Sequence, residues 1–182
     1  MEYTSKTVTL KNGKACLIRR AEEADAEALL ELMRAVTGES TNLVLEPGEI
    51  TTTVEREREI LRANCEADRS LVLLASVDGT LAGTCNFGSA GKRNRTLHRS
   101  AMGISVRRAF WGLGIGTALL EEILDAAKSA GYEQMELEVV STNAPAVGLY
   151  KKMGFEAMGT MPRTLKFQDG TYADFLFMVK YL

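Results

Sequence analysis

Three glycines stand at alternate positions near the middle of the chain, at Gly112, Gly114 and Gly116, directly before an amphipathic apolar segment. Glycine at the entrance of a helix lets the backbone approach a ligand closely, and the N–H groups of the first helical turn have no partner within the helix. Together with the positive end of the helix dipole, these donors favour a phosphate group. The sequence therefore predicts a site for a phosphate-bearing cofactor.

Two other glycine-rich phosphate motifs fit this segment less well. A P-loop requires Lys and then Ser or Thr after its last glycine, whereas Thr117 and Ala118 follow here, which excludes that motif. A dinucleotide-binding fingerprint requires a third glycine where Leu119 stands, and it usually opens a domain. Glu136 and Glu138 lie at a tolerable distance for its ribose-binding acid, but the fingerprint remains the poorer interpretation.

A second motif follows the glycine turn in the segment NAPAVGLYKKMGF. The two motifs, in this order and at this separation, resemble the signature of the GNAT superfamily of N-acetyltransferases, whose glycine turn binds the pyrophosphate of acetyl-coenzyme A. Trp111 stands where Gln or Arg is commonest in that family, a small departure because the phosphate contacts there are mainly made by the backbone. The residues of the second motif that fall in register are Asn143, Ala146, Leu149, Tyr150, Gly154 and Phe155.

The resemblance implies where the cofactor lies. Strands around Val106 and Val139 are expected to run parallel and splay apart, and the pantetheine arm pairs with the edge of the first of them as an extra strand would. Arg107 precedes the turn and is placed to attract phosphate. The expected cofactor-binding residues are Ile104, Ser105, Val106, Arg107, Trp111, Gly112, Leu113, Gly114, Ile115, Gly116, Thr117, Asn143 and Tyr150.

The reaction implied by the resemblance sets requirements of its own. The amine must be neutral when it attacks a thioester, so the site has to hold it close and accept its proton. We expect the N–H of Val106 to stabilise the negative charge that builds on the carbonyl oxygen, and the hydroxyl of Tyr150 to protonate the departing thiolate. Asn143, which precedes Ala144-Pro145, is expected to cap a helix and to hold its side chain near the cofactor or the acceptor.

His98 is the third catalytic candidate, as a base or proton relay, because the ordinary pKa of histidine suits proton transfer near neutrality. Its strand resembles the GNAT strand that often supplies the base, where this subgroup commonly reads His-x-x-Glu-x-Gly. This chain has Ala101 in place of that Glu. A surface histidine beside arginines is the competing interpretation.

The remaining charges are interpreted as solvated. Glu136 and Glu138 alternate with apolar residues, which is typical of the outer face of a strand. Lys92, Arg93, Arg95 and Arg99 are interpreted as a solvated basic loop and its margin.

Periodicity and turn signals predict a single domain over residues 1–182. Hairpins are expected around Asn12-Gly13, Asp78-Gly79 and Asp169-Gly170. Helices are expected at about 22–36 and 53–64, after the glycine turn, and around Tyr150. This order matches the GNAT arrangement, so the expected class is α/β (α+β), with a mixed, mostly antiparallel sheet, splayed parallel central strands and flanking helices.

Bulk properties narrow the function further. A formal charge of −2 gives no reason to expect a nucleic acid or an anionic membrane as partner, and no apolar run reaches membrane-spanning length. The N-terminus does not resemble a signal peptide, so a cytoplasmic location is expected. Cys16, Cys65 and Cys85 are odd in number and widely spaced, which indicates reduced thiols, and with one histidine no metal site is expected.

These observations favour an acetyl-coenzyme A-dependent N-acetyltransferase. Acidic residues crowd the region from 22 to 49, which shapes the acceptor side in GNAT enzymes, so the expected acceptor is the primary amine of a small cationic molecule such as a polyamine or an aminoglycoside. A solvated helix face explains most of these acidic residues equally well. Two alternatives stay open: acetylation of a protein, at its N-terminus or at a lysine, and a non-catalytic acyl-coenzyme A-binding protein. The strands expected at the end of the sheet, residues 172–179 among them, allow a homodimer.

Overall fold

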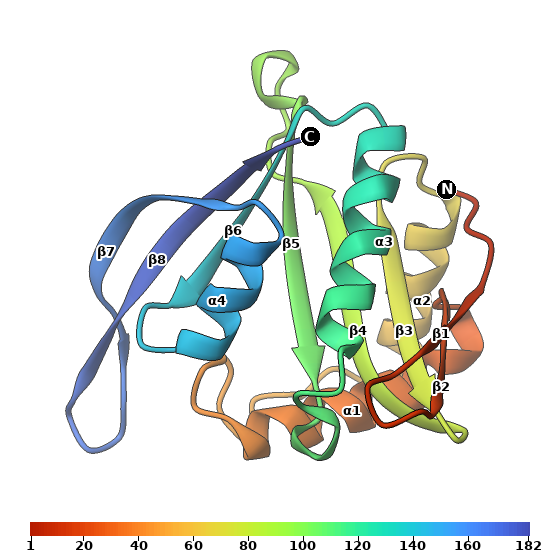
Figure 1. Ribbon diagram of the computed structural model, residues 1–182, viewed down its shortest axis with the longest axis horizontal. Helices are drawn as coiled ribbons and strands as arrows, with labels where there is room; N and C mark the ends of the chain where they lie inside the picture. The colour runs from red at the N-terminus through yellow and green to blue at the C-terminus, as the bar shows by residue number, and fades with distance from the viewer.

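The computed structural model describes residues 1–182 and contains an eight-stranded sheet (Figure 1). The strands are β1 (Lys6–Thr9), β2 (Ala15–Arg20), β3 (Leu71–Val77), β4 (Thr80–Ser89), β5 (Arg99–Val106), β6 (Gln134–Val140), β7 (Glu156–Lys166) and β8 (Tyr172–Tyr181). The helices are α1 (Ala26–Glu39), α2 (Val54–Glu66), α3 (Ile115–Ser129) and α4 (Ala144–Lys152), with short 3-10 turns η1 (Glu23–Asp25), η2 (Asn94–Thr96) and η3 (Arg108–Phe110). The mixed α/β class with a mostly antiparallel sheet is confirmed.

The order of strands across the sheet is β1-β2-β3-β4-β5-β6-β8-β7. The predicted hairpins form, and every neighbouring pair is antiparallel except β5 and β6. Parallel neighbours need a crossover, and α3 supplies it because it connects the end of β5 to the start of β6. The predicted parallel central pair is therefore confirmed.

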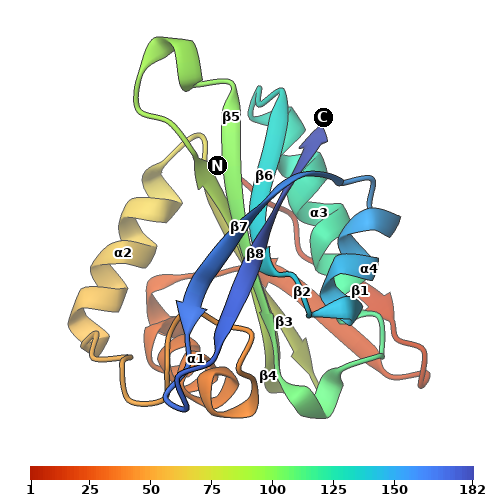
Figure 2. The same cartoon turned by 90° about the vertical axis from the view of Figure 1, so that its left-hand side faces the viewer.

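Helices cover both faces of the sheet (Figure 2), with α1 and α2 on one face and α3 and α4 on the other. The predicted helix at about 22–36 starts later, at Ala26, because a 3-10 turn occupies Glu23–Asp25. At its other end the helix continues to Glu39. Thr53 caps α2 by accepting a hydrogen bond from the N–H of Arg56 at 3.2 Å. No helix is both long enough and apolar enough to cross a membrane.

The main core lies between the sheet and α3. Leu119, Leu120 and Ile123 are fully buried there against β3, β4 and β6. A smaller core joins α1 to α2 and β3 on the opposite face, through residues such as Leu32, Leu61 and Leu74. Apolar residues at helical spacing on both faces thus hold the sheet in the middle of the molecule.

The pairing between β5 and β6 is short. It comprises three residue pairs, from Arg99↔Gln134 to Ala101↔Glu136, and then stops. On its other edge β5 stays paired with β4 along its length, from Ser100 to Val106. The two central strands diverge beyond Ala101 (Figure 1), so the edge of β5 from Met102 onward is left without a partner strand.

Candidate active site

The glycines of the turn are required for two different reasons. Gly112 and Gly114 have φ of 75° and 101°, in the left-handed region that side chains rarely adopt. Gly116 is already inside α3, and a Cβ placed on it would lie 3.0 Å from Cδ2 of Leu149 on α4. The first two glycines shape the turn, whereas the third lets α3 and α4 approach each other.

The turn presents an uninterrupted run of free backbone donors. None of the N–H groups from Gly112 to Thr117 donates a hydrogen bond within the protein, and the first is made by Ala118, to the carbonyl of Gly114. Gly114 is the N-cap of α3 and offers no side chain to satisfy these groups. Successive free N–H groups at a helix N-terminus form a site for an anion, and they fit a diphosphate.

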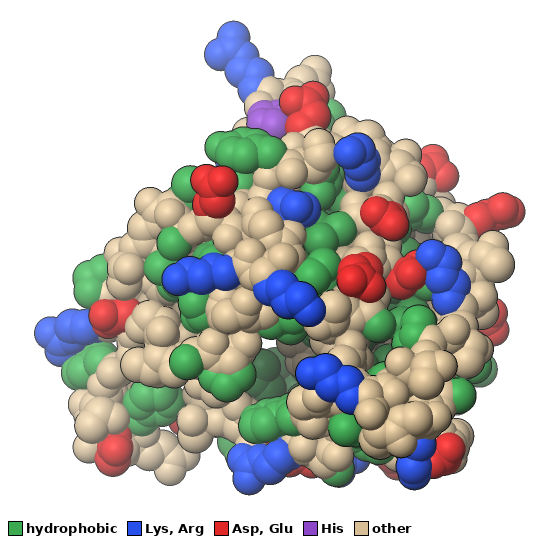
Figure 3. Space-filling view, in the orientation of Figure 1, with side chains coloured by type: hydrophobic (Ala, Val, Ile, Leu, Met, Phe, Trp, Pro, Cys, Tyr) green, Lys and Arg blue, Asp and Glu red, His purple; other side chains and the backbone are tan.

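A cleft of about 1260 Å³ begins at this turn and continues between β5 and β6. Figure 3 shows a hollow in the lower centre of the molecule, with apolar side chains inside it and Lys and Arg side chains around it. Side chains alternate across the sheet, so the cleft has two halves, on opposite faces. We call the half beside α3 and α4 the cofactor half, because the cofactor is expected there, and we call the half beside α1 and the loop of residues 40–53 the acceptor half.

The edge of β5 faces this cleft with its backbone. The N–H of Arg107 donates to the carbonyl of Ala82 on the β4 side, at 2.9 Å. Since successive N–H groups of a strand point to opposite edges, the N–H of Val106 points away from β4 and into the opening. Ile104, Ser105 and Val106 all line the cleft. The geometry predicted for these residues is therefore present, and their contacts with a ligand stay a prediction.

Tyr150 and Asn143 line the same cleft from α4. Tyr150 is only 7% exposed, its ring contacts Phe155 edge-on, and its hydroxyl makes no hydrogen bond within the protein. Burial, with a smaller contribution from nearby Cys85, raises the pKa of Tyr150, so the hydroxyl keeps its proton. Asn143 caps α4 as predicted, because its Oδ1 accepts a hydrogen bond from the N–H of Ala146 at 3.4 Å.

Three of the predicted site residues, His98, Arg107 and Leu113, do not line the cleft. His98 lies before β5, where its carbonyl accepts hydrogen bonds from the N–H groups of Glu133 and Gln134. Its position opposes the role of base or relay, and the competing interpretation fits better. Arg107 is held elsewhere by an ion pair, so a direct phosphate contact by its guanidinium is not supported. Trp111, Gly112, Gly114, Ile115, Gly116 and Thr117 do line the cleft, whereas Leu113 presents only its free N–H.

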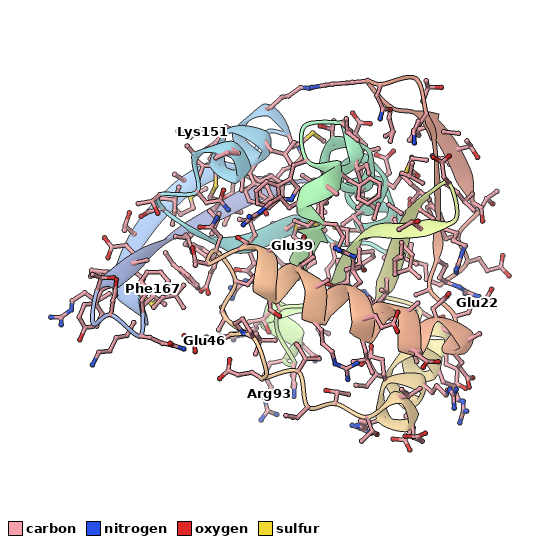
Figure 4. All side chains as sticks on the ribbon, turned by 90° about the horizontal axis from the view of Figure 1, so that it is seen from below. Glu22, Glu39, Glu46, Arg93, Lys151 and Phe167 are labelled. Atoms are coloured by element: carbon pink, nitrogen blue, oxygen red, sulfur yellow. The ribbon has the colours of Figure 1, made fainter.

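Glu39 holds the segment before the glycine turn. Its carboxylate accepts hydrogen bonds from Nε of Arg107 at 2.8 Å and from the backbone N–H of Arg108 at 2.7 Å, and its carbonyl accepts from the guanidinium of Arg108. Burial opposes ionisation of this carboxyl, but the hydrogen bonds outweigh it and lower the pKa of Glu39. Figure 4 shows Glu39 at the inner end of α1, below the start of α3. The acceptor-side helix and the glycine turn are thus joined directly.

The loop of residues 40–53 that follows Glu39 forms one wall of the acceptor half. Ser40, Asn42, Leu43 and Val44 line the cleft. At the outer side the loop contacts the β7–β8 turn, where Nε2 of Gln168 donates to the carboxylate of Glu46 at 3.0 Å. Glu39 and Glu46, both labelled in Figure 4, therefore hold the cleft-lining part of the loop, residues 40–44, from its two sides. The acidic residues attributed to a cationic acceptor are in these two cases used by the protein itself.

An ion pair in the acceptor half was not predicted. Arg99 donates from Nε and Nη2 to the two carboxylate oxygens of Glu136, at 3.0 and 2.7 Å, and both residues line the cleft. Glu136 is only 5% exposed, so its interpretation as part of a solvated face is wrong. Alternation correctly placed Glu136 on the face of β6 opposite the core residues Met135 and Leu137. The parallel register that brings Arg99 of β5 beside it is not visible in the sequence.

A splayed sheet with an anion-binding turn at the mouth of its cleft defines a class of coenzyme A-dependent transferases, and comparison with known proteins agrees. Residues 27–155 match the Acetyltransferase (GNAT) family. The chain belongs to the GNAT family. It is an acetyl-coenzyme A-dependent N-acetyltransferase, as the sequence motifs indicated.

Relatives with assigned activities acetylate amines of several kinds. The chain is 31% identical over 109 residues to the L-amino acid N-acetyltransferase AaaT of Escherichia coli strain K12, a match that covers 59% of this chain and 66% of that protein, just under two thirds. It is 26% identical over 165 residues to an L-methionine sulfoximine/L-methionine sulfone acetyltransferase of Pseudomonas paraeruginosa, covering 88% of this chain and 91% of the relative. An N-alpha-acetyltransferase of Sulfurisphaera tokodaii is 30% identical over 154 residues, covering 80% of this chain and 83% of the relative.

Solved structures give the same fold. A GNAT-family acetyltransferase from Streptococcus pneumoniae superposes with a TM-score of 0.88 at 32% identity, covering 92% of this chain and 99% of that one. A Salmonella typhimurium acetyltransferase, yncA, solved with its cofactor acetyl-CoA, gives a TM-score of 0.79 at 25% identity, covering 91% of this chain and 92% of that one.

Proposed function

We propose that this enzyme transfers the acetyl group of acetyl-coenzyme A to the primary amine of a small molecule, by direct attack of the amine on the thioester. The observation that carries the proposal is the run of free N–H groups from Gly112 to Thr117, which opens on the cleft that also contains Tyr150. A diphosphate at that turn would leave the pantetheine arm to follow the unpaired edge of β5.

Each role follows from the position of a group in the cleft. Acetyl-coenzyme A supplies the activated acetyl group when it is bound. The N–H of Val106 stabilises negative charge on the carbonyl oxygen as the bond between nitrogen and carbon forms. Tyr150, whose hydroxyl is protonated and free, gives a proton to the sulfur as the carbon–sulfur bond breaks, and the proton that the amine nitrogen loses returns through water to the Tyr150 oxygen. Asn143 holds the start of α4 so that Tyr150 stays beside the splayed strands.

The test is an acceptor panel with acetyl-coenzyme A, in which release of free thiol is followed and products are identified by mass spectrometry. The panel contains amino acids, polyamines, aminoglycosides and peptides with free N-termini or lysines. We expect turnover with small amines that depends on Tyr150, whereas the variant Lys92→Gln, changed in the exposed basic loop, keeps wild-type rates. Thiol release that occurs with peptides alone would reject a small-molecule acceptor.

The second candidate is acetylation of a protein N-terminus, which the similarity to an N-alpha-acetyltransferase favours. A peptide acceptor must lie along an open groove, whereas the loop of residues 40–53 forms a wall beside the acceptor half. The hydrogen bond between Gln168 of the β7–β8 turn and Glu46 of this loop holds the wall in place, which favours a small-molecule acceptor over a peptide.

A homodimer and a cytoplasmic location stay predictions. Strand β7 lies at the edge of the sheet and exposes Met158 and Met161, at 45% and 55%, which supports association of two copies along this strand. Light scattering coupled to size-exclusion chromatography measures the mass of the protein in solution. Met161→Lys should shift a dimer toward the monomer.

A further inference from the structure

The Arg99–Glu136 pair stands in the wall of the acceptor half, at the last level where β5 and β6 are paired. Ala101 and Glu136 are partners in the parallel register, and Arg99 reaches along its own strand to the carboxylate of Glu136. The side chain of Glu136 is 7% exposed and that of Arg99 is 37% exposed. The carboxylate is thus enclosed, while part of the guanidinium faces the cleft.

The pair leaves donors unused. A guanidinium carries N–H groups on three nitrogens, and Glu136 accepts from Nε and Nη2 only. Nη1 has no hydrogen-bond partner in the protein. An enclosed ion pair is by itself weak evidence for stability, because desolvation offsets much of its attraction. Glu136 fixes the orientation of a planar cation whose remaining edge suits a carboxylate.

The small side chain of Ala101 leaves the Arg99 guanidinium accessible to a ligand in the cleft. In the GNAT subgroup that the sequence resembles, a Glu commonly occupies this position, on the same strand and the same face as Arg99. Here a methyl group lines the cleft instead. With no second carboxylate from β5 to compete for it, Arg99 remains available to an anion from outside.

A carboxylate without a partner lies one step further along β6. Glu138 is on the same face as Glu136, lines the cleft and makes no ion pair. Two residues of a strand span about 7 Å, so Glu138 is about that far along β6 from Glu136, which holds the guanidinium. An α-amino acid whose carboxylate binds the guanidinium can then direct its amine toward Glu138. Phe175 and Phe177 of β8 supply apolar surface beside them.

We propose that Arg99, oriented by Glu136, binds the carboxylate of the acceptor, and that Glu138 lies beside its amine, so that the substrates are apolar α-amino acids. This inference rests on the proposed transfer to a small-molecule amine and names its substrate class. It replaces the expectation of a polyamine or an aminoglycoside, because such polycations would meet the guanidinium with like charge. Arg99 is then a binding residue and Glu136 a positioning residue.

The experiment compares each amino acid with the amine that lacks only its carboxylate: leucine with 3-methylbutylamine, and phenylalanine with 2-phenylethylamine. For the wild-type enzyme we expect kcat/KM to favour the amino acids by about 10- to 100-fold, the range expected for a hydrogen-bonded charged pair. Arg99→Gln should remove this preference by raising KM for the amino acids, and should leave the simple amines within about 3-fold. Arg95→Gln, in the exposed basic loop, serves as the matched control.

Two further variants separate recognition from folding. Arg99→Gln/Glu136→Gln removes both charges, so no enclosed carboxylate is left without a counter-ion, and it should lose the preference for amino acids as the single variant does. Ala101→Glu restores a competing carboxylate and should raise KM for the amino acids alone. Equal kcat/KM for amino acid and amine in the wild type, or an equal loss for both in Arg99→Gln, overturns the proposal.

Binding without turnover distinguishes this inference from the proposed function. If no amine releases thiol, transfer to a small amine is rejected, and calorimetry with coenzyme A present still compares N-acetylleucine with N-acetyl-3-methylbutylamine. Tighter binding of N-acetylleucine that disappears in Arg99→Gln supports the carboxylate site. Equal binding of the two, or no binding of either, overturns it.

Discussion

The two halves of the cleft are built in different ways. The cofactor half uses main-chain groups of one continuous segment, from the end of β5 through the glycine turn into α3. The acceptor half uses side chains from β5, β6, β8 and the loop of residues 40–53, which are distant in sequence. Binding by main-chain groups depends on backbone shape, whereas binding by side chains depends on which residues long-range folding brings together. We therefore expect binding in the cofactor half to tolerate most side-chain substitutions, and binding in the acceptor half to be sensitive to them.

Tyr150→Phe tests the chemistry at the boundary between the halves and should have the largest effect. Loss of a proton donor typically lowers kcat by about 100-fold or more, while the affinity for acetyl-coenzyme A should hardly change. Because burial raises the pKa of Tyr150 above its ordinary value of 10.0, the wild-type enzyme should keep this proton donor up to pH 10. Steady-state rates across pH, with calorimetry for the cofactor, check both statements; an unchanged kcat contradicts the acid role.

Gly114→Val tests whether backbone shape alone forms the cofactor half. With φ of 101°, a β-branched residue at this position is strained, so the turn should adopt another shape and the affinity for acetyl-coenzyme A should fall by about 10- to 100-fold. Calorimetry measures the affinity, and circular dichroism shows whether the fold persists. Gly38→Ala is the control, since Gly38 lies in α1 with open space around it. If a folded Gly114→Val protein kept its affinity for acetyl-coenzyme A, the turn would not be the binding site of the diphosphate.

Glu39→Gln tests the connection between the halves. Removing the charge should weaken the hydrogen bonds to Arg107 and Arg108 and let the loop of residues 40–53 move. Misplacement of a positioning element is expected to raise the acceptor KM by about 10-fold, with a smaller effect on acetyl-coenzyme A. The exposed Glu31 on the same helix provides the control variant Glu31→Gln. A rise in the KM for acetyl-coenzyme A without a rise in the acceptor KM would instead assign Glu39 to the cofactor half alone.

Trp111→Phe should have the smallest effect. Trp111 is 51% exposed, and its indole N–H donates to the carbonyl of Val106 at 2.6 Å. If the turn binds phosphate through its backbone, the affinity for acetyl-coenzyme A should stay within about 3-fold, as for most surface substitutions. A larger loss, measured by calorimetry, would show that a side chain of this turn contributes to binding.

The same difference explains what the sequence could predict. The turn and the cap at Asn143 follow from local spacing, because glycine conformation and helix capping act over a few residues, whereas the place of Tyr150 beside the cofactor was implied by the family resemblance. The hairpins and the helix faces follow from turn dipeptides and periodicity for the same reason.

The acceptor half depended on register and on long-range pairs. That Glu39 is held by Arg107, and Glu136 by Arg99, follows from contacts across 68 and 37 positions of the chain. Composition showed acidic residues near the N-terminus but not their partners, so they were attributed to the acceptor. His98 is a candidate because of its residue type and the resemblance of its strand to the family pattern, and neither shows whether the residue lines the cleft.

The short pairing of β5 with β6 has a consequence for the stability of the protein. Beyond Ala101 the sheet is incomplete, and the open edge of β5 offers main-chain groups that a pantetheine amide can satisfy. A ligand that completes the sheet binds the folded chain and not the unfolded one, so its binding free energy adds to the free energy of unfolding. If the pantetheine arm binds as proposed, the melting temperature of this protein should rise with the concentration of coenzyme A or its thioesters, even when no acceptor is present.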